Sequence, residues 1–216
     1  MPDSDLVIPL FPIRAVLFPG VAIPMNVFEQ RYRTMMEEVL AGDRTFGIVL
    51  IKTGLEVGGP ATPMDVGTIA SVEDLQRRQD GRMSFNALGR QRFRILELIH
   101  DRPYLRGRIK LLPVDEPPAD ATLVDHVRVS FFVYLEAAAG LTGGWLHEWC
   151  KAADGLALSY VVAYYMQAAQ QIKQGLLESP DVKARLEHEA KLLRHETERL
   201  RQARPPQPQG PFFNVN

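Results

Sequence analysis

The chain has 216 residues, of which 46% are hydrophobic and 24% charged, a composition typical of a globular protein large enough to bury a sizeable core. A formal net charge of -1 provides no overall attraction for nucleic acid or anionic lipid, and the single cysteine, Cys150, excludes an internal disulfide. The N-terminus lacks a signal-peptide pattern and no apolar run approaches the roughly 20 residues of a membrane span, so we expect a cytoplasmic protein that does not associate with membranes.

The first predicted elements are short apolar runs in residues 8–33, IPLFPIRAVLFPGVAIPMNVFEQRYR. Four prolines exclude a long helix here: Pro9, Pro12, Pro19 and Pro24. Edge strands tolerate proline, so we predict two short strands around a Phe-Pro-Gly turn, the second covering residues 22–27. A helix should follow, with Asn26 as its cap, Glu29 in capping-box position and Gly42 in a left-handed conformation at its end.

Longer strands are predicted next. Residues 45–52 form an apolar run short enough for a buried strand, and a Gly- and Pro-rich loop follows. Residues 66–79 and 82–101 flank Asp80-Gly81, a favoured hairpin dipeptide, and Gly89 interrupts the alternation of the second strand, which predicts a bulge. Residues 104–114 supply a last strand.

Helical patterns fill the rest of the chain after a Pro-rich boundary at residues 114–120. Asp120 is the predicted cap of the first helix, residues 155–174 should form one central buried helix, and Ser179-Pro180-Asp181 should open the last helix. The predicted organisation is therefore α+β. It divides the chain into a β-rich unit with one helix (1–116), a helical bundle (117–204) and a flexible Pro-rich tail (205–216).

Three separated segments resemble one known family. They are PLFPIRAVLFPGVAIPMNVFEQRY (9–32), LGRQRFRI (88–95) and LLESPDVKARLEHEAKLL (176–193). Together they resemble the N-terminal domain of Lon-type ATP-dependent proteases, and more closely the stand-alone bacterial proteins that consist of that domain. The resemblance implies a pseudo-barrel related to PUA domains followed by a helical bundle, and a role in recognising non-native proteins for proteolysis-related quality control.

The sequence contains no pattern that indicates catalysis. It has no GxxxxGK[ST] loop to hold ATP phosphates, and no stretch corresponds to the Ser-Lys peptidase domain of Lon. His188 and His195 lie seven residues apart on one helix, too far for two ligands of one zinc ion. We therefore expect a non-enzymatic protein with no catalytic residue, no cofactor and no metal.

Arg90, Arg92 and Arg94 alternate along the second long strand and should project from one face. On a PUA-like barrel, such a stripe is a candidate for contacting RNA phosphates. Acidic residues close in sequence offer an alternative, a solvated strand face held by ion pairs: Glu73, Asp74, Asp80, Glu97 and Asp101.

The turn after the first strand is the candidate for binding polypeptides. Phe18, Pro19, Val21 and Ile23 are apolar residues at a position that is hard to bury, and exposed apolar patches mark interaction sites. The alternative is that Phe18 and Ile23 plug the end of the barrel. The preferred function is a module that binds unfolded or specific client proteins, with a protease or ATPase acting in trans as a further partner. The other hypotheses are RNA contact and self-assembly into a homo-oligomer through the helical half.

Overall fold

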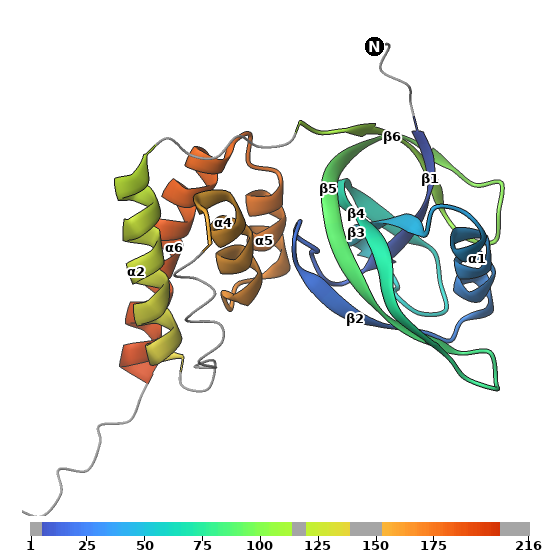
Figure 1. Cartoon of the computed structure of the whole chain (residues 1–216), viewed down its shortest axis with the longest axis horizontal. Helices are drawn as coiled ribbons and strands as arrows, with labels where there is room; N and C mark the ends of the chain where they lie inside the picture. Colours follow the sequence, from blue (N-terminus) through green and yellow to red (C-terminus); the bar gives the residue numbers. More distant parts are fainter. Residues whose placement is uncertain (1–5, 114–119, 139–152, 204–216) are drawn as a thin grey trace, which may run out of the picture.

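The computed structural model describes residues 6–113, 120–138 and 153–203, which form a β-rich half and a helical half (Figure 1). The six strands in the described residues are β1 (Leu6–Ile13), β2 (Ala22–Val27), β3 (Thr45–Gly54), β4 (Ala61–Arg77), β5 (Met83–Ile99) and β6 (Arg106–Leu111). The helices are α1 (Gln30–Ala41), α2 (Ala121–Ala137), α4 (Gly155–Tyr165), α5 (Gln170–Leu177) and α6 (Val182–Ala203). This arrangement confirms the predicted α+β fold, whereas the boundary near residue 116 and the tail 205–216 lie outside the described residues.

The sheet curls into a ring. Its strand order is β2-β5-β4-β3-β1-β6, and an additional pairing of β5 with β6 closes it. β1 runs parallel to β3, and the other pairs are antiparallel. β5 is long enough to pair with β2 through its first half and with β6 through its second half. The ring is thus complete without β2, which extends from it as an edge strand (Figure 1).

The predicted hairpin and bulge of the long strands are confirmed. Gly81 has a φ of 81° at the turn between β4 and β5, a conformation that glycine adopts without steric cost. The pairing register shifts by one residue between Thr68–Arg92 and Ala70–Gly89. Gly89 donates its N–H to Val21 O (2.8 Å) and accepts from Gly20 N (2.9 Å), so it fixes the turn that leads into β2.

The boundaries of α1 differ from the prediction. Asn26 lies in β2, and the N-cap is Glu29, whose side chain makes no capping hydrogen bond. The Glu29 carboxylate accepts instead from Arg31 and from the N–H of Gly58, so a tertiary contact replaces the capping box. Gly42 does end the helix, but its φ of -101° is not left-handed.

The helical half also differs from the predicted pattern in one place. Asp120 caps α2 as predicted, through Leu123 N at 3.1 Å. The single helix predicted over 155–174 is wrong, because the chain breaks between α4 and α5 and turns the second piece onto the barrel. Asp181, through Ala184 N, caps α6. No helix in the described ranges combines the length and apolarity that crossing a membrane requires.

The last helix buries two charged residues beside a row of mostly apolar side chains. The row itself is buried at Val182, Leu186, Ala190, Leu193 and Thr197. Arg185 and Glu189 are also fully buried. Arg185 donates from Nε to Ser159 Oγ (2.9 Å) and lies over the ring of Tyr160, while neither carboxylate oxygen of Glu189 has a hydrogen-bond partner among the described residues.

We expect Glu189→Gln to weaken the pH dependence of stability. Burial raises the pKa of the Glu189 carboxyl well above its ordinary value of 4.5, and Arg185 only partly opposes this. Because the folded-state pKa is raised, the stabilising contribution is present at low pH and is lost as pH rises through that value. The difference in free energy of unfolding between the Gln variant and the native chain should therefore shift in favour of the variant as the pH rises from 4.5 to 8.

Urea denaturation at these two pH values measures the difference. Glu187→Gln is the matched control, because Glu187 is exposed on the same helix. Parallel pH profiles for the Glu189→Gln variant and the native chain would contradict the prediction.

Candidate functional site

The Phe18–Val21 turn, predicted as an exposed apolar surface, is mostly covered. Phe18 is 0% exposed, and Val21 and Ile23 are buried, while Pro19 is partly exposed. The ring of Phe18 packs against Tyr160 of α4, with centroids 6.2 Å apart. The expectation of exposed Phe18 and Val21 side chains is wrong because the helical half covers the turn, and the alternative, that Phe18 is a plug, describes its position.

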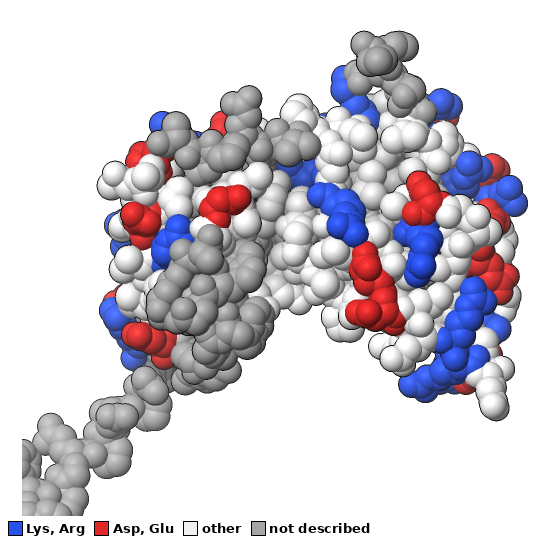
Figure 2. All heavy atoms as spheres, viewed as in Figure 1, with Lys and Arg blue, Asp and Glu red and all other residues white. Residues whose placement is uncertain are grey.

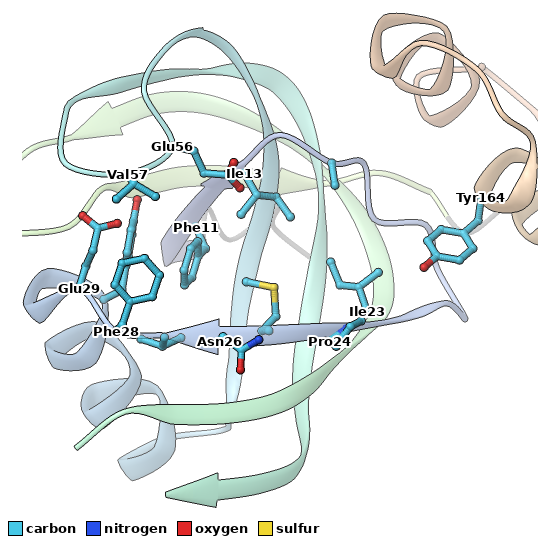
Figure 3. A pocket seen from close by; sticks show the side chains of 14 residues that line it. Phe11, Ile13, Ile23, Pro24, Asn26, Phe28, Glu29, Glu56, Val57 and Tyr164 are labelled. Atoms are coloured by element: carbon cyan, nitrogen blue, oxygen red, sulfur yellow. The ribbon is translucent and has the colours of Figure 1, made fainter. Parts of the chain in front are cut away.

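A groove nearby presents the apolar surface that the turn does not. It lies between β1 and β2, has a volume of about 510 Å³ and is bounded by the β3–β4 loop and by Tyr164 of α4 (Figure 3). We call it the β1–β2 groove; its main apolar lining residues are Phe11, Ile13, Ile23, Met25, Phe28 and Val57. In Figure 3 the side chains of Phe11 and Ile13 face the strand that carries Ile23, across an open space. Ile23 is thus the one predicted residue of the turn region that lines this groove.

The rim of the groove is apolar and open to solvent. Phe28, directly after β2, is 52% exposed, and Val57 in the β3–β4 loop is 54% exposed. In the floor, the rings of Phe11 and Tyr32 stack with their centroids 4.0 Å apart. Burial raises the pKa of the Tyr32 hydroxyl, so this ring stays neutral at physiological pH. Exposed apolar side chains above a preformed apolar floor are typical of a binding site.

Polar contacts hold the rim in place. Glu29 accepts from Gly58 N at 3.1 Å, and Arg31 donates to Gly59 O at 2.9 Å, so the start of α1 fastens the β3–β4 loop. The Arg31 guanidinium also lies 4.5 Å from the centre of the Tyr32 ring. The position of Val57 therefore depends on α1 as well as on its own loop.

The arginine stripe does not form a continuous exposed surface. Arg90 is exposed but pairs with Glu73 (2.8 Å), which agrees with the salt-bridged alternative. Arg92 is only 5% exposed, and its Nη1 donates to Leu177 O and to Ser179 O, both at 2.8 Å. The expected RNA-contacting face thus loses its central residue, because α5 covers it. On the face shown in Figure 2, basic and acidic side chains also alternate over the barrel instead of gathering by sign.

A second groove lies between α2 and α6. Its volume is about 440 Å³, and it is lined by Val129, Val133 and Leu193 with polar neighbours. Val129 is 59% exposed. This is the surface in the helical half that corresponds to the self-assembly hypothesis.

Comparison with known proteins identifies the family of this chain. Residues 7–195 match the family described as the ATP-dependent protease La (LON) substrate-binding domain. The chain belongs to the Lon substrate-binding domain family. The Lon protease of Methylocella silvestris is 30% identical over 210 residues, a match that covers 93% of this chain and 25% of that protein. The Lon protease of Syntrophus aciditrophicus is 28% identical and is covered over 26% of its length, so the chain spans about a quarter of these relatives.

Solved structures share the Lon N-domain fold. The Lon N-terminal domain protein from Xanthomonas campestris has a TM-score of 0.63 at 23% identity, with 84% of this chain and 95% of that chain covered. The N-terminal domain of the Mycobacterium avium complex Lon protease has a TM-score of 0.65 at 18% identity, with 88% and 98% covered. At these identities the likeness establishes the fold, and it confirms the resemblance inferred from the three sequence segments.

Sequence patterns missed most of the β1–β2 groove. Phe28 and Val57 lie 29 positions apart in the chain, and Val57 belongs to none of the three segments that resemble the family. One available signal was Phe28 itself, a large apolar residue directly before a helix that is otherwise amphipathic. The partner loop was not predictable, because Glu29 and Arg31 position it through tertiary contacts.

Proposed function

We propose that this chain binds apolar segments of non-native polypeptides in the β1–β2 groove and that it catalyses no reaction on them. One observation carries the proposal: an open, preformed apolar groove of about 510 Å³ with half-exposed Phe28 and Val57 at its rim. The family description, a substrate-binding domain of a protease, supports an unfolded polypeptide as the occupant.

The proposal also assigns a partner. The chain matches about a quarter of each Lon relative, and these relatives are proteases, so the partner we propose is an ATP-dependent protease that degrades the bound client. Binding alone requires no cofactor.

The test is the double variant Phe28→Ser with Val57→Ser. Both side chains are about half exposed, so their replacement should leave the fold intact. The ligand is a reduced, alkylated protein that cannot refold. Loss of two apolar contacts should weaken its binding about tenfold, which corresponds to roughly 1.4 kcal/mol. Fluorescence anisotropy with the labelled unfolded protein measures the dissociation constant.

The matched control is Leu96→Ser with Val129→Ser. These two residues are 50% and 59% exposed and lie outside the β1–β2 groove. Equal affinity of both double variants and the native chain would place the client site elsewhere. Weaker client binding by the control variant alone would favour the groove between α2 and α6 as the client site.

A further inference from the structure

β2 has a free edge. Among the described strands it pairs only with β5, while every other strand pairs on both edges along at least part of its length. A free edge carries backbone N–H and C=O groups that another extended chain can pair with.

The pairing pattern assigns which backbone groups face outward. Gly89 N donates to Val21 O, and in an antiparallel pair the bonded residues alternate along the strand. Ile23, Met25 and Val27 are therefore the β2 residues that bond to β5. The backbone groups of the alternate residues, Ala22, Pro24 and Asn26, point to the free edge. Pro24 has no N–H, and at this position its absence costs nothing in the pairing with β5.

The β1–β2 groove runs along this free edge. Seven consecutive residues, Ile23 to Glu29, line it. Side chains of Ile23 and Met25 are buried, and those of Pro24 and Asn26 are exposed, so both faces of the strand border the groove. Because both faces of β2 border the groove, the groove runs parallel to the backbone of this strand. The six residues of β2 extend for roughly 20 Å, which is the length of a short added strand.

The charges around the groove fit a neutral or basic occupant. Its lining residues include two carboxylates, Glu29 and Glu56, and no Lys or Arg. Arg31 pairs with Glu29. Glu56 accepts a hydrogen bond from the backbone N–H of Arg14, and within the described ranges no ion pair involves its carboxylate. An acidic segment would therefore meet repulsion in the groove.

We propose that the client enters the β1–β2 groove as an extended strand that pairs with the free edge of β2. Alternate side chains of this strand face Phe11 and Ile13 across the groove. This inference rests on the proposed function and specifies the conformation of the bound segment. Pro24 then limits affinity, because it withholds one N–H from the middle of the edge.

The decisive experiment is a gain of affinity. Pro24→Ala adds an N–H at the free edge, and one more hydrogen bond, worth about 1 kcal/mol, should tighten binding about fivefold. The probe is a fluorescein-labelled peptide of alternating Val and Thr with a Lys at each end. Asn26→Pro removes an edge N–H and should weaken binding about fivefold relative to Asn26→Ala, which controls for loss of the contact from Ser84 Oγ.

Unchanged or weaker binding by a folded Pro24→Ala variant, or equal binding by Asn26→Pro and Asn26→Ala, would overturn the strand addition. If the native chain binds neither the peptide nor the unfolded protein, the proposed function fails as well. A different outcome separates the two proposals: the native chain binds both the peptide and the unfolded protein, the Phe28/Val57 double variant binds more weakly, and Pro24→Ala does not bind more tightly. That outcome removes only the strand-addition inference.

Discussion

Replacing Arg92 with Met is expected to lower the free energy of unfolding by about 3 kcal/mol and to loosen the barrel from the helical half. The guanidinium donates to the carbonyls of Leu177 and Ser179 at the C-terminal end of α5. Met fills similar space but leaves these carbonyls without their donor in a buried interface. The hydrogen bond from the Gln174 side chain to Val66 O (3.0 Å) then remains between α5 and β4.

Urea denaturation followed by two signals measures both effects. Pulsed hydrogen exchange across the urea series follows the peptides of α4 to α6 separately from those of the barrel, whereas far-UV circular dichroism follows the whole chain. The two transitions should coincide in the native chain and separate in the Arg92→Met variant. Arg94→Met is the control, because Arg94 is exposed on the same strand and its loss should change stability by less than about 0.5 kcal/mol. Equal behaviour of the two variants would contradict the role of Arg92.

Gly89→Ala is expected to destabilise the fold by about 3 kcal/mol. A Cβ at this position would lie 2.2 Å from the carbonyl oxygen of Phe18, a backbone atom that has little freedom to move. The same glycine bonds Gly20 and Val21, so the turn would have to shift away from β5 and carry Ile23 with it. Since Ile23 lines the β1–β2 groove, client binding should weaken too.

Thermal denaturation tests this prediction, with a fall in Tm of roughly 6–10 °C expected for a chain of this size. Gly42→Ala is the matched control, because its Cβ would meet its nearest neighbour at an ordinary 3.7 Å and the glycine has a φ of -101°. Gly42→Ala should change stability by less than about 1 kcal/mol. Equal Tm values for the two variants would show that the Phe18–Val21 turn can shift without loss of stability.

Local sequence patterns correctly predicted those features of the strands that have local causes. Asp80-Gly81 predicted the hairpin because its turn requires a positive φ, which Gly81 adopts. Gly89 predicted the bulge because it interrupts an otherwise regular alternation. The three separated segments led to the correct family, and all three lie within residues 7–195, which match it.

Three expectations were decided by packing or pairing between elements far apart in sequence. Phe18 follows an apolar pattern that fits either a patch or a plug, and only the position of α4 decides between them. Arg92 follows the same alternation as its exposed neighbours, and α5 covers it from 85 positions away in the chain. Asn26 has the residue type of a helix cap, but pairing with β5 extends the strand through it.

The closed ring has a consequence for substitutions in β2. β5 closes the ring with β6 through its second half and holds β2 through its first half, so the two pairings are independent. Substitutions at the exposed positions of β2, Ala22, Pro24 and Asn26, therefore leave the closure intact, whereas Ile23, Met25 and Val27 belong to the buried core. The barrel can keep its closure while the exposed side of its edge strand changes.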